Sequence, residues 1–159
     1  MAETPETDPA RIVADADVLA ADLLVGGRAR EALDAIRSYS WLDLVASDRL
    51  LDDAQAVIRE LADEDLAAAW REHVAELRTP VEHPAGDHPA LASAYRGQAA
   101  HVLSYDEGLR NAEAGATLGS RLSVSVKTPA GFVTLFDAES LYDAVEGGEY
   151  PGPDRDPRG

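Results

Sequence analysis

Apolar positions along the chain follow two patterns: short continuous runs typical of buried strands, and longer stretches with helical spacing. The runs that predict strands are 11–14, 44–46, 101–104 and 122–126. Between them, apolar residues recur every three or four positions, as on the buried face of an amphipathic helix. The stretches with this spacing are 18–24, 29–39, 48–61, 63–77, 89–96, 107–115, 128–136 and 138–145. Ser47 or Asp48 is placed to cap the third of these helices, and the Pro- and His-rich segment 79–89 is predicted to be a loop.

Strands that alternate with helices predict parallel pairing, because a crossover between parallel strands needs a dozen or more residues. We therefore expect an α/β fold, a three-layer α/β/α sandwich with a central parallel sheet. The 159 residues fit one domain with a core of its own. We place that domain at residues 10–146, between an N-terminal tail (1–9) and a C-terminal tail (147–159) that are both predicted to be disordered.

The charge of the chain changes the picture of its surroundings. Thirty acidic residues face fourteen basic ones, which gives a formal net charge of −16, and Lys127 is the one lysine. This composition indicates a halophilic protein from a cytosol that holds molar salt, where the Debye length falls to about 3 Å and self-repulsion costs little. The alternative is an ordinary acidic protein of a GC-rich mesophile. In molar salt, the negative charge does not exclude a nucleic-acid partner.

Several classes of protein are excluded by composition. The chain has no cysteine, so disulfides, thiolate metal sites and cysteine nucleophiles are ruled out. Its apolar runs are too short to span a membrane, since even Val18–Val25 is interrupted by Asp22. Met1–Pro9 lacks the basic and apolar regions of a signal peptide. We therefore expect a cytoplasmic protein with no membrane partner.

Acidic residues follow two of the predicted strands directly. Asp15 and Asp17 come after the first strand, and Asp106 comes after Leu103-Ser104-Tyr105. Ligands of open α/β sheets gather beyond the carboxyl ends of the strands. Carboxylates at the same end of neighbouring strands repel each other unless a cation lies between them, and oxygen ligands favour Mg²⁺ or Mn²⁺. The alternative is that each aspartate only caps the helix that follows its strand.

Five short motifs occur in order along the chain. An apolar strand precedes Asp-x-Asp and Val-Leu; a Ser and an apolar pair precede an acid; an Asp precedes Leu-Ala-x-Ala; a Ser stands two residues before an Asp; and a strand precedes Thr-Pro. They occupy Ile12–Leu19, Ser47–Asp53, Asp87–Ala94, Leu103–Asp106 and Ser125–Phe132. In this order they resemble the motifs of the PIN-domain nucleases, over about residues 11–136.

The resemblance implies a set of site residues. The family's metal-binding and catalytic acids fall on Asp15, Asp53, Asp87 and Asp106, and its polar accessory residues fall on Asp17 and Ser104. Asp53 stands where the family usually has Glu, with Asp52 beside it as a competitor, and Asp17 stands where Asn is common.

The function implied by the resemblance is cleavage of phosphodiester bonds, with single-stranded RNA as the expected substrate and Mg²⁺ or Mn²⁺ as the cofactor. One version is the ribonuclease toxin of a toxin–antitoxin pair, with an antitoxin protein as its partner. A second version is an RNA-processing nuclease. The rival is a catalytically weak PIN-like scaffold that binds a partner protein or RNA. PIN relatives often form homodimers, and the apolar helix around Trp70 is a candidate interface.

The charge leads to a first testable prediction. If the acidity is an adaptation to salt, the fold is stable in molar KCl and weakens as salt is removed, because carboxylate repulsion is then no longer screened. Thermal unfolding midpoints measured across a KCl series should rise steeply from low salt. A flat profile would show that the acidity serves another purpose.

Overall fold

The computed structural model describes residues 8–82, 89–106 and 125–155. In chain order the elements are β1 (Asp8–Ala14), α1 (Ala16–Leu24), α2 (Gly27–Arg37), β2 (Asp43–Ser47), α3 (Asp48–Leu61), α4 (Glu64–Leu77), β3 (Thr79–Val81), α5 (Pro89–Gly97), β4 (Ala99–Leu103), β5 (Ser125–Lys127), α7 (Pro129–Leu135) and α8 (Ala138–Val145). The predicted alternation of strands and helices is confirmed within these ranges. The helix predicted at 107–115 lies outside the described residues.

The strands form one five-stranded parallel sheet in the order β3-β2-β1-β4-β5. β1 lies at its centre, paired with β2 on one side and β4 on the other, and its last three residues, Ile12 to Ala14, are at most 1% exposed. A continuous apolar run of this kind is expected for a parallel strand buried on both faces. The strand starts at Asp8, so Asp8 and Pro9 of the predicted tail belong to the sheet.

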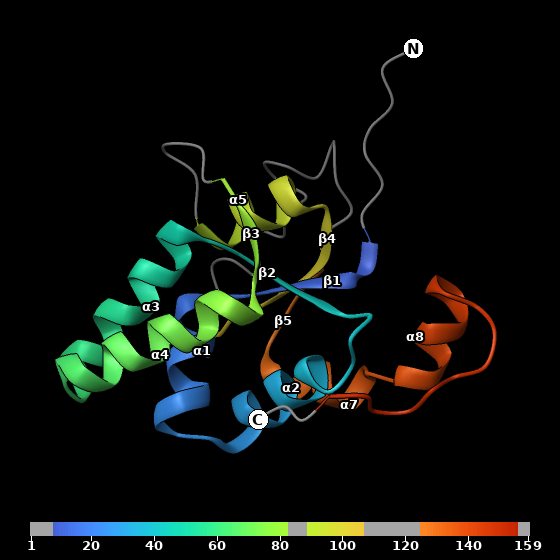
Figure 1. Cartoon of the computed structure of the whole chain (residues 1–159), viewed down its shortest axis with the longest axis horizontal. Coiled ribbons are helices and arrows are strands. Elements are labelled where there is room, and N and C mark those ends of the chain that lie inside the picture. Colours follow the sequence, from blue (N-terminus) through green and yellow to red (C-terminus); the bar gives the residue numbers. More distant parts are fainter. Residues whose placement is uncertain (1–7, 83–88, 107–124, 156–159) are drawn as a thin grey trace, which may run out of the picture.

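Helices cover both faces of the sheet, which confirms the expected α/β/α arrangement. α5 packs on β1, β2 and β4 on one face, while α2 and α7 pack together on the other. α3 contacts both α1 and α4 beside the carboxyl ends of the strands (Figure 1). α5 lies very close to β2 at Gly97, where an added Cβ atom would collide with the side chain of Val45.

The loop predicted at 79–89 is wrong at its start, because residues 79–81 form the strand β3. Ala46 of β2 lies opposite Pro80 in this pair. Proline is tolerated here because β3 is an edge strand, where one missing N–H donor breaks no interior ladder. Three residues carry too little pattern to be recognised without their partner strand.

Helix starts follow the expected capping chemistry. The Oγ atom of Ser47 accepts a hydrogen bond from the backbone N–H of Leu50 at 3.1 Å, which decides between Ser47 and Asp48 as the cap of α3. Thr128 caps α7 in the same way, through the N–H of Gly131 and with proline as the first helical residue.

None of the helices in the described part of the chain has the length and apolarity needed to cross a lipid bilayer.

The segment after α8 contains no helix or strand in its described part, 147–155, yet it contacts the body of the domain. The backbone N–H groups of Asp154 and Arg155 both donate to the carbonyl oxygen of Ser38, at 2.9 and 3.0 Å. The hydroxyl of Tyr150 donates to that of Tyr39 at 2.9 Å. These contacts hold the segment against the end of α2.

A buried ion pair joins α1 to α2 across the turn between them. Nη1 of Arg37 lies 3.0 Å from Oδ2 of Asp22, and the two side chains are only 9% and 2% exposed. Breaking a buried pair leaves one charge without its partner in a medium that solvates it poorly. The connection between the two helices therefore depends on both members.

We predict that Arg37→Met lowers the free energy of unfolding by about 3–5 kcal/mol, because the buried carboxylate of Asp22 loses the guanidinium beside it. The double variant Asp22→Leu/Arg37→Met should recover part of this loss, since it leaves no buried charge. Arg28→Met is the matched control, because the pair of Arg28 with Glu31 is 64% and 51% exposed. It should cost at most about 1 kcal/mol. Denaturant titration measures all three values, and equal losses for Arg37→Met and Arg28→Met would contradict the argument.

Candidate functional site

The strand order identifies the place where a ligand site is expected. From β1 the chain moves outward to β2 and β3, and it then returns to the other side of β1 to form β4. In open α/β sheets, ligands bind beyond the carboxyl ends of the strands at such a reversal. Here the reversal lies between β1 and β4. Asp15 and Asp17 follow β1, and Ser104 and Asp106 follow β4.

Ser104 links the two strand ends. Its backbone N–H donates to the carbonyl oxygen of Lys127 at 2.9 Å, and the N–H of Asp15 donates to the carbonyl oxygen of Leu103 at 2.8 Å. The Oγ atom of Ser104 donates to Oδ2 of Asp15 at 2.8 Å and accepts from the N–H of Asp106 at 3.0 Å. The hydroxyl is fully buried, so it fixes the spacing of the two aspartates.

Asp15 has a structural role as well. Its Oδ1 atom accepts from the N–H of Ala16 at 2.8 Å and caps α1, as the capping alternative expected. An ionised carboxylate has about four acceptor positions on its two oxygens, so a carboxylate that caps a helix can also bind a cation. Capping and metal binding are therefore compatible in this residue.

The carboxylate of Asp17 is only partly held by hydrogen bonds. Its Oδ2 atom accepts from the N–H of Tyr105 at 3.2 Å, but its Oδ1 atom is buried without a hydrogen-bond partner. Burial and then the neighbouring charge of Asp15 raise the pKa of Asp17, and Asp106 adds to this effect. A hard cation would stabilise a carboxylate oxygen of this kind, which is buried, has no hydrogen-bond donor and lies among like charges.

A cavity of about 480 Å³ opens beside these three aspartates. Asp15, Asp17 and Asp106 line one part of it. The remaining wall is apolar and is contributed by α1 and by the later turns of α3, where Val57 and Leu61 lie. Leu61 is 72% exposed and Val25, on the same cavity, is 80% exposed. The site therefore combines an acidic end with an exposed apolar rim, and the sequence pattern does not predict that rim.

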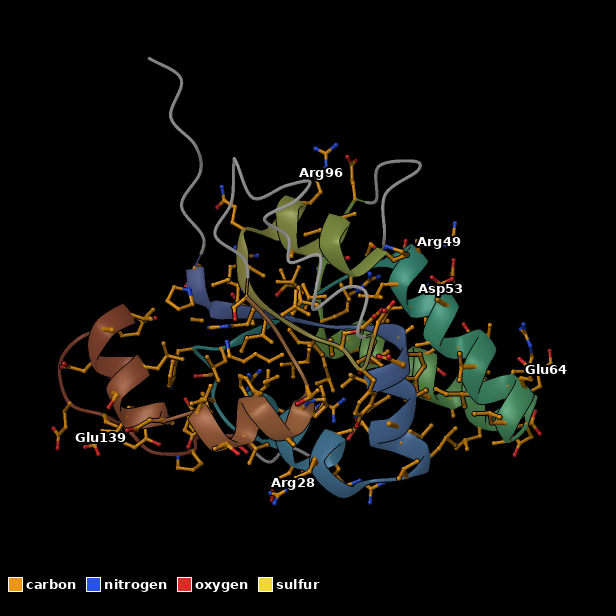
Figure 2. The ribbon with its side chains drawn as sticks, turned by 180° about the vertical axis from the view of Figure 1, so that it is seen from behind. Arg28, Arg49, Asp53, Glu64, Arg96 and Glu139 are labelled. Atoms are coloured by element: carbon orange, nitrogen blue, oxygen red, sulfur yellow. The ribbon has the colours of Figure 1, made fainter. Side chains whose placement is uncertain are left out.

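The structure does not bring Asp53 into this group. Its Oδ1 atom accepts from Nε of Arg49, one helical turn earlier, at 3.2 Å, and Figure 2 shows the two side chains together on the outer side of α3. The competing residue Asp52 is paired with Arg71 of α4. Val57 and Leu61, one and two turns after Asp53, are the α3 residues that line the cavity.

Asp87, the remaining predicted ligand, lies outside the described residues. Across residues 8–82, 89–106 and 125–155, no group of three or more His, Asp or Glu side chains is arranged to hold a metal ion. Mg²⁺ does not need such a cage, because it keeps several waters and is usually held by one or two carboxylates together with substrate phosphates. Two carboxylates among Asp15, Asp17 and Asp106 would be enough for an ion of this kind.

The chain matches a known family over a region that covers both the site and the C-terminal contacts. A model described as a family of unknown function (DUF7384) matches residues 6–158. The chain belongs to this family. No curated protein and no solved structure matches it. The region shared with DUF7384 includes β1, the three aspartates and the segment that returns to α2.

The raised pKa of Asp17 leads to a prediction about stability in this DUF7384 chain. A carboxyl whose pKa is raised by folding destabilises the folded state when charged, so this cost is present above the raised pKa and disappears below the ordinary value of 3.8. Asp17→Asn keeps an acceptor for Tyr105 and removes the charge. In metal-free buffer it should raise the unfolding midpoint at pH 7, and the gain should vanish on acidification.

Asp48→Asn provides a control of opposite sign. A hydrogen bond from Arg78, together with its charge, lowers the pKa of Asp48. The charged form of Asp48 therefore stabilises the fold above its ordinary pKa, and this contribution is lost as the pH falls. Asp48→Asn should lower the midpoint slightly at pH 7. A lower midpoint for Asp17→Asn at neutral pH would mean that its hydrogen bond to Tyr105 outweighs the repulsion.

Proposed function

We propose that this protein is a divalent-metal-dependent nuclease that cleaves single-stranded RNA. The observation that carries the proposal is the group of three aspartates at the point where the strand order reverses, with the Oδ1 atom of Asp17 buried and unpartnered. The motif resemblance to PIN-domain nucleases supports the same chemistry. Mg²⁺ or Mn²⁺ is the proposed cofactor, held by Asp15, Asp17 and Asp106, with Asp87 as a further proposed ligand.

The roles of the side chains follow from their contacts. When bound, the metal supplies Lewis acidity and positive charge for hydrolysis of a phosphodiester. Ser104 orients Asp15 through the hydrogen bond to its Oδ2 atom and holds the backbone of Asp106 in register with it. The N–H of Tyr105 fixes the carboxylate of Asp17. The chain therefore builds its acidic end from residues that orient one another.

A single strand suits the surroundings of the aspartates. The side chain of Tyr105 stands between Ser104 and Asp106 in sequence and is 44% exposed. Exposed aromatic rings stack on unpaired bases with little regard to sequence. Toxin-type and RNA-processing ribonucleases are both compatible with this arrangement. The toxin version additionally requires an antitoxin protein as partner.

A second candidate function is a scaffold of the same fold that binds a partner protein without cleaving RNA. The exposed apolar residues Val25 and Leu61, beside the acidic end of the cavity, favour it. An apolar rim of this kind fits a protein segment better than a phosphate backbone. The two functions differ in whether metal binding and RNA cleavage depend on the same aspartates.

We predict that Mn²⁺ stabilises the protein by binding its folded state. When the Mn²⁺ concentration is one hundred times its dissociation constant, the free energy of unfolding should rise by about 2.7 kcal/mol. For a domain of this size, the melting temperature should rise by several degrees. Asp15→Asn and Asp106→Asn should each reduce this shift, measured at fixed KCl by calorimetry, and they should also reduce cleavage of a mixed-sequence single-stranded RNA. Asp53→Asn tests whether Asp53 leaves Arg49 and binds the metal. If this variant loses the Mn²⁺ shift in melting temperature, Asp53 is also a metal ligand.

Asp143→Asn is the matched control, because it removes one carboxylate from an exposed position on α8, at the other end of the sheet from α1 (Figure 1). It should leave both the Mn²⁺ shift and the cleavage rate unchanged. If wild type shows neither a Mn²⁺ shift nor RNA cleavage, and the Asp15 and Asp106 variants only lose stability, the aspartates are helix caps. The scaffold function would then be favoured.

A further inference from the structure

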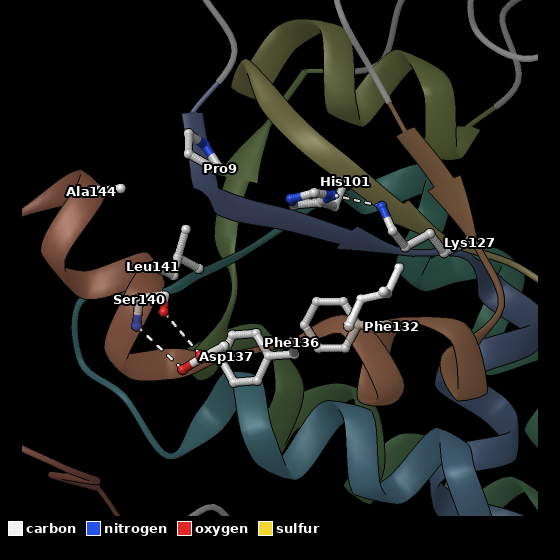
Figure 3. A pocket seen from close by; sticks show the side chains of 10 residues that line it. Pro9, His101, Lys127, Phe132, Phe136, Asp137, Ser140, Leu141 and Ala144 are labelled. Atoms are coloured by element: carbon white, nitrogen blue, oxygen red, sulfur yellow. Dashed lines mark hydrogen bonds between the residues drawn. The ribbon is translucent and has the colours of Figure 1, made fainter.

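A second cavity, of about 410 Å³, lies between the sheet and the helices α7 and α8 (Figure 3), and Asp15, Asp17 and Asp106 are not among its described lining residues. β4 and β5 contribute its polar end, through His101 and Lys127, while α7 and the residues after it contribute an aromatic wall. Its volume lies within the range of small-molecule sites, which are mostly apolar with a few polar groups that set orientation. None of its residues belongs to the proposed nuclease site.

The apolar wall is built from stacked rings. Phe132 and Phe136 have ring centroids 5.1 Å apart and planes inclined by 20°. Phe132 is 4% exposed and belongs to the core, so the wall is anchored on its inner side. Leu141 and Ala144 of α8 continue the lining on the opposite side. A flat or branched apolar body would be enclosed between these two sides.

The polar end holds the one lysine of the chain. Nζ of Lys127 lies 2.6 Å from Oγ of Ser125 and 3.4 Å from Nδ1 of His101. Burial and the charge of Lys127 lower the pKa of His101 to about 4, so the imidazole is neutral at pH 7. An ammonium group only donates, so Nδ1 is the acceptor and the ring proton resides on Nε2. The cavity therefore offers an ammonium and an imidazole N–H as donors, and Lys127 is the one cation among the described residues that line it.

The rim limits the charge that a ligand can carry. Asp137 also lines the cavity, and its carboxylate accepts hydrogen bonds from the backbone N–H and the hydroxyl of Ser140, at 3.3 and 2.9 Å. These bonds lower the pKa of Asp137, which keeps it charged at neutral pH. A ligand with two or more negative charges would meet this carboxylate with Lys127 as the one cation that the described lining residues supply. A monoanion suits the site better than a phosphate.

We propose that this cavity binds a small organic monocarboxylate with an aromatic or branched apolar body. The carboxylate pairs with Lys127 and accepts from Nε2 of His101, and the apolar body packs against Phe132 and Phe136. The ammonium is already held by Ser125 and His101, so little side-chain entropy is lost when the anion arrives. This site is independent of the proposed nuclease activity.

The probe for this proposal is 4-fluorophenylacetate, with 4-fluorophenylacetamide as a neutral analogue of the same shape. Binding is followed by ¹⁹F NMR line broadening in KCl at a concentration where circular dichroism confirms the fold. We expect the wild-type protein to bind the carboxylate about tenfold more tightly than the amide, a ratio equivalent to about 1.4 kcal/mol. Equal affinity for both probes, or no binding of either, would overturn the proposal.

Three variants locate the binding site. Lys127→Gln should weaken the carboxylate about tenfold and leave the amide unchanged, while Lys127→Arg should retain most of the preference for the acid. Ala144→Trp adds bulk at an exposed position of α8 that lines the cavity, so it should block both probes without disturbing the core. Asp15→Asn should leave the affinity for both probes unchanged, because Asp15 lines the other cavity. Undiminished carboxylate binding by folded Lys127→Gln or by Ala144→Trp would place the probe elsewhere and refute the assignment.

Discussion

The structure depends on the parallel pairing of β1 with β4. The sheet could not otherwise reverse its direction of growth, and the residues after the two strands would not meet. Hydrogen bonds at the last rungs, from Asp15 to Leu103 and from Ser104 to Lys127, bring the ends of β1, β4 and β5 to one level. Because β1 and the end of β4 are buried, the register of this pair is fixed by the apolar side chains that the two strands share with the core. The position of every polar group at that edge follows from this register.

Ser104 shows how one small side chain can serve both folding and chemistry. A hydroxyl can donate and accept at the same time, so it connects a carboxylate on one strand to a backbone amide on the next. A fully buried hydroxyl without such partners would be costly. The same bonds hold Asp15 and Asp106 beside Asp17, and the charges of these two aspartates raise the pKa of Asp17. The fold thus tolerates local electrostatic strain where a cation would relieve it.

Sequence reasoning succeeded where the signal was local or repeated. The apolar runs around Val13 and Val102 predicted buried parallel strands, and the aspartates after them could be placed together because both strands end at the same edge. It failed where the deciding partner was distant. β3 forms because it pairs with β2, whereas the proline at position 80 favours a loop when the sequence is considered alone.

Side-chain pairing was equally hidden in the sequence. A motif position such as Asp53 does not reveal that Arg49, one turn away, lies within reach of its carboxylate. The pair of Asp22 and Arg37 forms across a turn, so no helical spacing connects them. The apolar rim of Val25 and Leu61 was missed for a related reason, since exposure depends on how α1 and α3 end beside each other. What could not be predicted was therefore the set of contacts between elements, while the elements themselves were largely readable.

The contacts of residues 150–155 with α2 bear on where the folding unit ends. A chain shortened after Glu146 would keep every described helix and strand, but the carbonyl oxygen of Ser38 would lose both of its backbone donors from the segment. Ser40 would lose Asp154 as its partner, and the ring of Tyr39 would lose its contact with Tyr150. Truncation tolerance is set by such bonds and by burial rather than by position in the sequence. The smallest fragment with an intact α2 surface therefore extends to Arg155, and a boundary drawn from secondary structure alone would cut through it.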